Sequence, residues 1–320
     1  MQTEIVLALL LIKGVGNITV ANFINTKKIG IESNAEGVFT EWTSFIAGKT
    51  RIETLNLAEF KNKIDDAHRI LLNNKILGID AISIIDSDFP QSLKGIKDPP
   101  VILYYKGNRN LLLHEKCIAV IGTRKATSHG LKIAEKMGAI LGENECCVVS
   151  GLALGCDAAA HQGCLSVNGK TIAILATPLD NIQPQSNNKL AEEILEKGGL
   201  LLSEYYPNQV LAKGFYVKRD RLQSGISKAV IVIETDVTGG TMHTVEFALG
   251  QKKILACYKH PSKYTHYKQV KGTAKLINEG KAKVIESKES ILELIDEISR
   301  QRIQGNQDCC EDAAQLEMLF

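Results

Sequence analysis

The chain has 320 residues, of which 44% are hydrophobic and 23% charged, a composition typical of an ordinary folded globular protein. Its 38 basic and 36 acidic residues leave a formal net charge of only +2, which excludes recruitment of nucleic acid by a global basic field. Any nucleic-acid site must therefore be a local cluster of basic residues.

The apolar runs of the sequence are short. None approaches the roughly 18–20 residues that a membrane-spanning helix needs. Met1–Glu4 places no basic residue ahead of the first apolar stretch, which argues against a secretory signal. We therefore expect a cytoplasmic protein with no membrane partner.

The sequence contains eight cysteines, and none of them forms a Cys-x-x-Cys pair or a zinc-finger spacing with histidine. Most of them stand in apolar runs, where a thiol behaves as a small hydrophobic side chain. We expect no metal site and no cofactor.

The first segment, to about residue 83, is predicted to consist of helices joined by polar turns. The apolar run Glu4–Ile12 is followed by the glycine-containing stretch Lys13–Thr19 and then by the apolar-periodic Val20–Ile24. This is the pattern of a helix-hairpin-helix, whose two glycines permit a tight turn with backbone N–H groups facing a phosphate. A small packing module without any ligand has the same pattern.

From residue 117 onward, short β-type apolar runs alternate with segments of helical periodicity. Continuous apolar strands that alternate with helices indicate a mostly parallel sheet covered by helices on both faces, and thus an α/β fold. The predicted strands are Cys117–Gly122, Cys147–Ser150, Thr171–Ala176, Leu200–Ser203, Ala229–Glu234 and Ile254–Cys257, preceded by the short β-type run Val101–Tyr105.

These patterns divide the chain into three parts. We expect a helical domain over residues 1–83, an α/β core over residues 84–286, and a C-terminal helix and tail over residues 287–320. The helix is predicted by an apolar stripe at helical spacing over Glu289–Ile298, and Gly305–Asp308 interrupts the pattern.

Ligands of open parallel sheets bind outside the carboxyl ends of the strands, so the segments that follow strands are the candidate sites. Four such segments combine small residues with hydroxyl groups or cations: Ile121–Lys125, Ser150–Asp157, Phe215–Arg221 and Glu234–Thr241. Glycines let the backbone approach an anion, N–H groups at helix starts bind phosphate, and arginine offers a bidentate fork. Together the four segments predict a site for a phosphorylated polymer or a nucleotide.

Some members of these segments also have a purely structural interpretation. Asp157 stands near a helix start, where it would cap the helix or have another structural role, and His161 fits a packed helix position better than a catalytic base. The basic and aromatic residues of Phe215–Arg221 suit single-stranded nucleic acid, because cations bind phosphates and rings stack on bases. A solvated basic helix start would look similar.

Six segments, in this order, resemble those of the DprA/Smf family of DNA-processing proteins: FPQSLKGIKDPPVILYYKG, IAVIGTRKATSHG, VVSGLALGCDAAAHQGCL, KTIAILATPLDNIQPQSN, LLSEY and AVIVIETDVTGGT. The resemblance runs from about Asp86 to Ile285. It implies an extended Rossmann-type α/β fold, preceded by a small helical (helix-hairpin-helix or SAM-like) domain. It also implies single-stranded DNA binding without enzymatic activity, in concert with a RecA-type recombinase during DNA uptake and natural transformation. We further expect a homodimer.

Carried over by position, the resemblance implies a DNA- and phosphate-binding pocket. Arg124, Arg219 and Arg221 would neutralise phosphates. Phe215 would stack on a base. The family's Arg-Asn-Arg is Arg219-Asp220-Arg221 here, so that Asp220 either weakens DNA binding or orients an arginine. The full predicted set is Gly122, Thr123, Arg124, Lys125, Ser150, Gly151, Asn187, Phe215, Arg219, Arg221, Gly239, Gly240 and Thr241.

A nucleotide-cleaving or nucleotide-sensing enzyme is the alternative. Phosphoribohydrolases of the wider Rossmann group carry a Gly-Gly turn with a glutamate shortly after it, and Gly239-Gly240 is followed by Glu246 at about that spacing. A carboxylate there would assist N-glycosidic cleavage by stabilising oxocarbenium-like charge. In this alternative Glu246 is the catalytic residue.

The tail Gln315–Phe320 is a second candidate binding element. It is similar to the peptide that binds the bacterial sliding clamp, which pairs a glutamine with closely following leucine and phenylalanine anchors. A tail that docks on its own domain is the other interpretation. The candidate contacts are Gln315, Leu316, Met318, Leu319 and Phe320.

Overall fold

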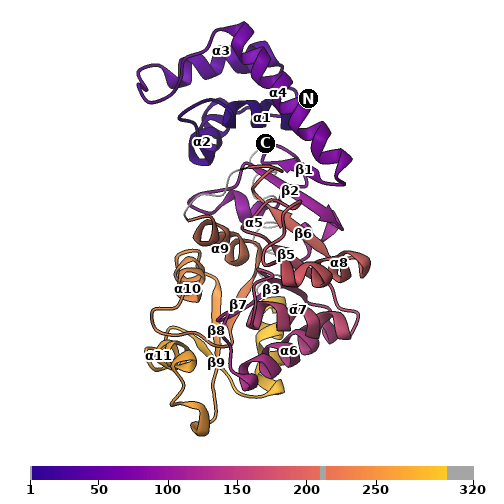
Figure 1. The fold of residues 1–320 in the computed structure, drawn as a ribbon. Coiled ribbons are helices and arrows are strands. Elements are labelled where there is room, and N and C mark those ends of the chain that lie inside the picture. The colour runs from indigo at the N-terminus through magenta and orange to yellow at the C-terminus, as the bar shows by residue number, and fades with distance from the viewer. Residues whose placement is uncertain (1, 210–213, 301–320) are drawn as a thin grey trace, which may run out of the picture. The chain divides into compact units, whose positions relative to one another are not determined.

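The computed structural model describes residues 2–209 and 214–300. Within them, nine mostly parallel strands are accompanied by helices, which confirms the predicted α/β class (Figure 1). The chain divides into two compact units. The first comprises the chain up to Leu113 together with Ile172–Ile226, and the second comprises His114–Thr171 and the described chain from Ser227 onward. Every helix in the described ranges is too short or too polar to cross a lipid bilayer.

The first unit begins with the helices α1 (Gln2–Leu10), α2 (Asn17–Lys27), α3 (Ala35–Ile46) and α4 (Leu57–Ile76). The starts of the last two follow from the sequence, because Asn34 caps α3 and Asn56 forms a capping box with Glu59 at α4. Phe23 and Trp42 are buried between these helices, with their rings edge to face at 5.1 Å. The predicted helical start of the chain is confirmed.

A glycine turn joins α1 to α2. Gly14 has a φ of +85°, where a side chain is strained, and a Cβ atom there would lie 2.2 Å from the Arg51 carbonyl oxygen. Gly16 precedes α2 in an extended conformation and leaves the first turn without a side-chain cap. The two helices and their turn are as predicted, and phosphate contact at this turn stays a prediction.

Four strands belong to the first unit: β1 (Asp80–Ser83), β2 (Ile102–Gly107), β5 (Thr171–Ile174) and β6 (Leu200–Ser203). β2 is antiparallel to both β1 and β6, whereas β5 and β6 are parallel. The expectation of helices as far as residue 83 is wrong for β1. Its four residues are paired with β2, from Asp80 opposite Tyr105 to Ser83 opposite Ile102, because pairing with a distant strand outweighs a weak local pattern.

The remaining helical elements of the first unit are α5 (Gln91–Lys94), η1 (Arg109–Leu113), η2 (Gln185–Asn187), α8 (Asn188–Glu196) and α9 (Phe215–Ile226). α8 buries Leu190, Ala191 and Ile194. α9 starts at Phe215, so the predicted segment Phe215–Arg221 is the beginning of a helix.

The second unit holds a fully parallel arrangement of five strands in the order β4-β3-β7-β8-β9. Every residue of β3, β4 and β7 is buried, as continuous apolar strands between helical layers should be. β9 is not predictable from an apolar run, because only Ile285 of its residues is buried. The bounds are β3 (Cys117–Ile121), β4 (Cys147–Ser150), β7 (Ala229–Val232), β8 (Ile254–Tyr258) and β9 (Lys283–Ile285).

Helices of the second unit are α6 (Ser128–Glu143), α7 (Cys156–Ser166), α10 (Thr241–Gly250) and α11 (Lys271–Asn278), with the short turns η3 (Ser262–Tyr264) and η4 (Lys268–Val270). Residues 288–300 are also helical and place Ile291, Leu294 and Ile298 in the core, which confirms the predicted last helix. The tail residues Gln315, Leu316, Met318, Leu319 and Phe320 lie outside the described residues.

α6 and α7 pack backbone against backbone. A Cβ atom at Gly138 would lie 2.1 Å from the Ala160 carbonyl oxygen, and one at Gly163 would lie 1.8 Å from the Glu135 carbonyl oxygen. These distances leave no room for a methyl group. The two glycines therefore set how closely the two helices approach.

Candidate functional site

In the second unit, the segments that follow β3, β4 and β7 meet at the carboxyl ends of these strands. The Thr123 N–H donates to the Glu234 carbonyl (2.8 Å), and the Cys156 N–H donates to the Thr123 carbonyl (3.4 Å). A side chain at Gly155 would come within 2.3 Å of the Thr123 carbonyl oxygen. Three of the four predicted segments are thus held together through their backbones.

Gly122 and Ser150 hold this junction tightly packed. A Cβ atom at Gly122 would lie 2.4 Å from the Cys156 sulfur. The fully buried Ser150 hydroxyl donates to the Val120 carbonyl (2.7 Å). Both residues therefore shape the junction through contacts with other protein atoms.

Asp157 supports the turn after β4. Its carboxylate accepts a hydrogen bond from the Gly151 N–H (3.1 Å), whereas the residue before α7 is Gly155, which forms no side-chain cap. The acid therefore fixes the Ser150–Gly151 backbone. Asp157 therefore has a structural role, but it does not cap α7.

His161 is a packed helix residue, as expected. It is fully buried, and its Nδ1 lies 2.6 Å from the Thr171 hydroxyl oxygen. The Thr171 hydroxyl donates its own proton to the Val148 carbonyl, so we assign the proton between His161 and Thr171 to Nδ1 of the histidine.

Glu234 begins the predicted segment Glu234–Thr241, but sequence reasoning did not include it among the site residues. It is fully buried at the end of β7, where its carboxylate accepts hydrogen bonds from the Thr127 N–H (2.8 Å) and hydroxyl (2.6 Å). A Cβ atom at Gly130 would lie 2.3 Å from its carboxyl carbon, so only glycine fits there. The carboxylate thus fixes the start of α6, and with it the preceding loop. The signal in the sequence is a lone acid that ends an apolar strand.

The predicted cations of this unit are Arg124 and Lys125. Both lie in the loop between β3 and α6, and both are exposed. The Lys125 N–H donates to the Thr123 hydroxyl oxygen (3.2 Å), which tightens the loop. Two positive charges therefore face solvent on a backbone that Glu234 and Thr127 hold in place.

Gly239, Gly240 and Thr241 form the start of α10. The N–H groups of Met242 and His243 donate to the carbonyls of Gly239 (2.9 Å) and Gly240 (3.1 Å). Among the residues that the structure describes, none would lie within 4 Å of a Cβ atom at Gly240. Further along the helix, Glu246 is exposed.

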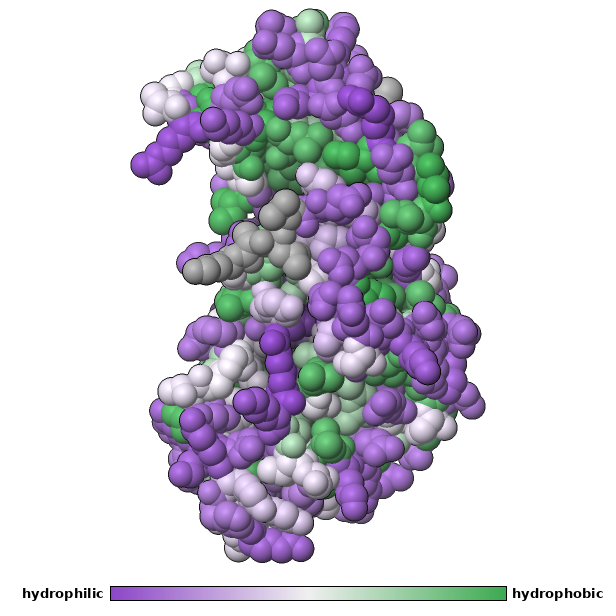
Figure 2. All heavy atoms as spheres, viewed as in Figure 1, coloured by the Kyte–Doolittle hydropathy of each residue, from purple (hydrophilic) through white to green (hydrophobic). Residues whose placement is uncertain are grey.

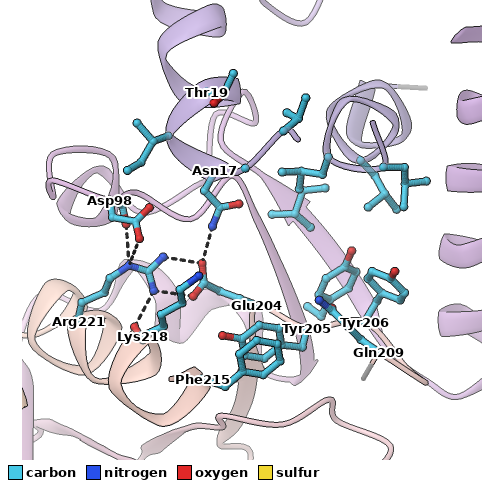
Figure 3. Close-up of a pocket in the computed structure, with 18 residues that line it drawn as sticks. Asn17, Thr19, Asp98, Glu204, Tyr205, Tyr206, Gln209, Phe215, Lys218 and Arg221 are labelled. Atoms are coloured by element: carbon cyan, nitrogen blue, oxygen red, sulfur yellow. Dashed lines mark hydrogen bonds and ion pairs between the residues drawn. The ribbon is translucent and has the colours of Figure 1, made fainter. Parts of the chain in front are cut away.

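In the first unit, Arg221 is buried and paired. Its guanidinium donates to both carboxylate oxygens of Glu204, at 2.6 and 2.7 Å, and to the carbonyl oxygens of Asp98 and Lys218, each at 2.7 Å (Figure 3). Asn17 of α2 adds a hydrogen bond to Glu204 (3.0 Å). Burial alone would lower the pKa of Arg221, but the bonds to Glu204 raise it, and the guanidinium stays charged.

Arg219 is also buried. Its Nη1 donates to the Ile174 carbonyl (2.6 Å) at the end of β5, and its Nε donates to the Asp220 carboxylate (3.1 Å). Of the two expectations for Asp220, the structure agrees with an acid that orients an arginine. The contacts of Arg219 and Arg221 are those of residues that position α9.

Phe215 lies on the rim of a cavity of about 430 Å³ in the first unit. Its ring stacks on Tyr205 with the centroids 3.9 Å apart and the planes 4° from parallel (Figure 3). Asn17 and Glu204 also line this cavity. Asn187, the other predicted residue of this unit, is buried in η2 directly before α8.

The mostly parallel α/β fold, with small-residue turns at the carboxyl ends of its strands, is of the Rossmann type. The family model described as DNA recombination-mediator protein A matches residues 80–296. The chain therefore belongs to this family, the DprA/Smf DNA-processing proteins, as its motifs indicate.

Individual relatives agree with this assignment. The DNA processing protein DprA of Streptococcus pneumoniae is 40% identical over 187 residues, which are 58% of this chain and 64% of that protein. The DprA of Bacillus subtilis is 32% identical over 249 residues, 77% of this chain and 82% of that protein. The protein Smf of Synechocystis is 40% identical over 169 residues, 51% of this chain and 42% of that protein. The chain thus spans less than two thirds of the first and last of these relatives.

Solved structures of DprA proteins also superpose on this chain. The X-ray structure of DprA from Streptococcus pneumoniae superposes with a TM-score of 0.71 at 30% identity, over 90% of this chain and 95% of that one. A structure of DprA from Helicobacter pylori, described by its single-stranded DNA binding mode, has a TM-score of 0.60 at 29% identity and covers 70% of this chain and 96% of that one.

Proposed function

We propose that this protein binds single-stranded DNA and acts as a recombination mediator that delivers the strand to a RecA-type recombinase during DNA uptake and processing. The observation that carries the proposal is the pair of exposed cations, Arg124 and Lys125, on a loop fixed by the buried Glu234 carboxylate. A loop whose backbone is already fixed binds phosphate with a smaller loss of conformational entropy. The description of the Helicobacter pylori relative by its single-stranded DNA binding mode supports the same ligand.

Within this proposal the predicted residues have different roles. Arg124 and Lys125 bind phosphates through their charges, and the backbone around Thr123 and Gly239–Thr241 approaches the strand closely. The buried Ser150 and Gly151 position the backbone of the turn after β4.

In the first unit, the half-exposed Phe215 is the candidate for base stacking, with Tyr205 behind its other face. Arg219 and Arg221 act on the strand only through the helix that they hold, because their guanidinium groups already bind protein acceptors. Asn187 is buried in η2, directly before α8, and is the remaining candidate of this unit. A homodimer, and a sliding-clamp contact through Gln315–Phe320, are further parts of the proposal.

The test is fluorescence anisotropy with labelled single-stranded and duplex oligonucleotides across a salt series. We expect the protein to prefer the single strand and to lose affinity as salt increases. Arg124→Ala should weaken binding by roughly tenfold, because one charge-assisted contact contributes about 1.5 kcal/mol, and should reduce the salt slope by about 0.7.

Lys136→Ala provides the matched control, because it removes an exposed charge from α6 of the same unit. It should leave both affinity and slope unchanged. Equal binding of single strands and duplexes, or equal losses in the two variants, would contradict the proposal. Release of a free base from a nucleotide, lost in Glu246→Gln, would instead support the hydrolase alternative.

A further inference from the structure

One stretch of the second unit is rich in lysines and aromatic rings and contains no carboxylate. This basic–aromatic segment, Lys259–Lys271, lies at the carboxyl end of β8, and the nearest acids along the chain are Glu246 and Glu279. Without its four lysines the formal charge of the chain, +2, would be negative. The segment contains Lys259, His260, Lys263, Tyr264, His266, Tyr267, Lys268 and Lys271.

Hydrogen bonds and an ion pair join the segment to the loops that carry the proposed phosphate-binding residues. The Gln269 side-chain amide donates to the Lys125 carbonyl (3.3 Å), and the Gly272 N–H donates to the Thr235 carbonyl (2.8 Å). Lys268 forms an ion pair with Asp236 (2.9 Å). The exposed groups of the segment therefore lie beside the loops that follow β3 and β7.

A ring stack holds the segment against α6. Tyr264 lies over His129 with the ring centroids 4.0 Å apart and the planes 7° from parallel. His260 lies behind this pair and donates from Nε2 to the Ile233 carbonyl (2.7 Å). The middle of the segment is thus an ordered surface.

The groups that face solvent are cations and a ring. Lys263, His266 and Lys271 are exposed, and Tyr267 is 41% exposed with its ring 4.1 Å from that of His266. Within residues 2–209 and 214–300, neither Lys263 nor Lys271 forms an ion pair with a carboxylate, whereas Lys259 and Lys268 do. The molecular surface around α11 is largely hydrophilic or of intermediate hydropathy (Figure 2).

Lysines interleaved with exposed rings match unpaired nucleotides in particular. Lysines bind phosphates, and a ring stacks on any base that is not in a duplex. We propose that the basic–aromatic segment is a second contact for single-stranded DNA, which continues from the Arg124–Lys125 loop. Lys263 and Lys271 bind phosphates of this stretch, and Tyr267 stacks on a base. This inference rests on the proposed function.

The test compares a short oligothymidine of about 6 nucleotides with one of about 20, because we expect the short strand to occupy the Arg124–Lys125 loop alone and the longer strand to continue onto the segment. The variants are Lys263→Gln/Lys271→Gln, Tyr267→Ala and Arg124→Ala. Lys136→Gln/Lys281→Gln removes two exposed charges elsewhere on the same unit and is the matched control. Unchanged thermal unfolding midpoints establish that each variant is folded.

We expect Lys263→Gln/Lys271→Gln to weaken binding of the longer strand roughly tenfold and to lower its salt slope by about 1.4, with the short strand unaffected. Tyr267→Ala should weaken binding of the longer strand about fivefold or more without changing the salt slope, and Tyr267→Phe should bind it with the affinity of the wild type.

Two results would overturn this inference but not the proposed function, provided that Arg124→Ala still weakens binding of both strands. In the first, the segment variants bind both strands with the affinity of the wild type. In the second, the control variant loses as much affinity as the segment variants. If the wild-type protein binds neither strand, the proposed function fails, and this inference fails with it.

Discussion

Glu204 and Arg221 are two buried charges that stabilise the first unit only together. Their side chains are 7% and 4% exposed, and each carboxylate oxygen accepts a hydrogen bond from the guanidinium. Replacing Glu204 leaves the Arg221 charge buried with only the Asp98 carboxylate, 3.5 Å from Nε, as its counterion, which costs more than the pair contributes.

We therefore expect Glu204→Gln to lower the free energy of unfolding by about 3–5 kcal/mol, measured by urea denaturation. Glu193→Gln is the control. It removes the same kind of charge from an ion pair, but the pair that Glu193 forms with Lys197 is partly exposed to solvent. It should change stability by less than about 1 kcal/mol. Similar midpoints for the two variants would show that the Arg221 charge is compensated in another way.

Partners that are far apart in the chain limit what sequence reasoning can predict about single residues. The family motif identifies Arg221, yet its acceptor on Asp98 is 123 positions away in the chain. No local pattern reports such a partner, and the burial of Arg219 and Arg221 was therefore not predictable. Glu234 was missed for the same reason, since its partner Thr127 is 107 positions away.

At the scale of elements, the crossing of α6 and α7 depends on two glycines. Gly163→Ala would place a methyl group 1.8 Å from the Glu135 carbonyl oxygen, so the helices would have to separate. We expect a loss of about 3 kcal/mol or more in the free energy of unfolding, at the upper end of overpacking effects.

Gly250→Ala is the comparison for this prediction. Gly250 ends α10, and a Cβ atom there would have no neighbour within 4 Å in the described part of the chain. Alanine should be neutral or stabilise by up to about 1 kcal/mol, because it has the higher helix propensity. Circular dichroism melts of both variants check the difference, and a stable Gly163→Ala protein would refute the close crossing.

The strands that sequence reasoning predicted are those with continuous apolar runs. β3, β4 and β7 are buried throughout, so their composition alone identified them. β1 begins with an exposed residue, and two of the three residues of β9 are exposed. Edge strands of this kind form because a neighbour offers hydrogen bonds, and this information is absent from their own sequence.

For the molecule as a whole, the histidines near the end of β8 make stability depend on pH. Burial lowers the pKa of His129, and the charge of His260 lowers it further. Burial likewise lowers the pKa of His260, although its bond to the Ile233 carbonyl and the nearby Glu234 oppose this. Both rings therefore favour the neutral form in the folded state.

In the unfolded chain both rings regain the ordinary histidine pKa of 6.5. Below that pH the unfolded state binds more protons than the folded state. The contribution of the two neutral rings to the free energy of unfolding is therefore fully present above pH 6.5, and it is lost as the pH falls toward the lower pKa values of the folded state. The melting temperature should decrease between about pH 7 and pH 5.5, before carboxylates titrate. His260→Gln should flatten this decrease. A wild-type melting temperature that is constant over the interval would refute the assignment.

The two units interleave along the chain, and this affects how the protein is made. β2 reaches its partner β6 only when residue 203 has been synthesised, and β3 lacks β7 until residue 232. During translation, β3 can pair with β4 early, but its other edge remains unpaired until β7 has been made. Folding of both units is therefore completed late in synthesis, and the nascent chain is a natural client for chaperones that shield unpaired strand edges.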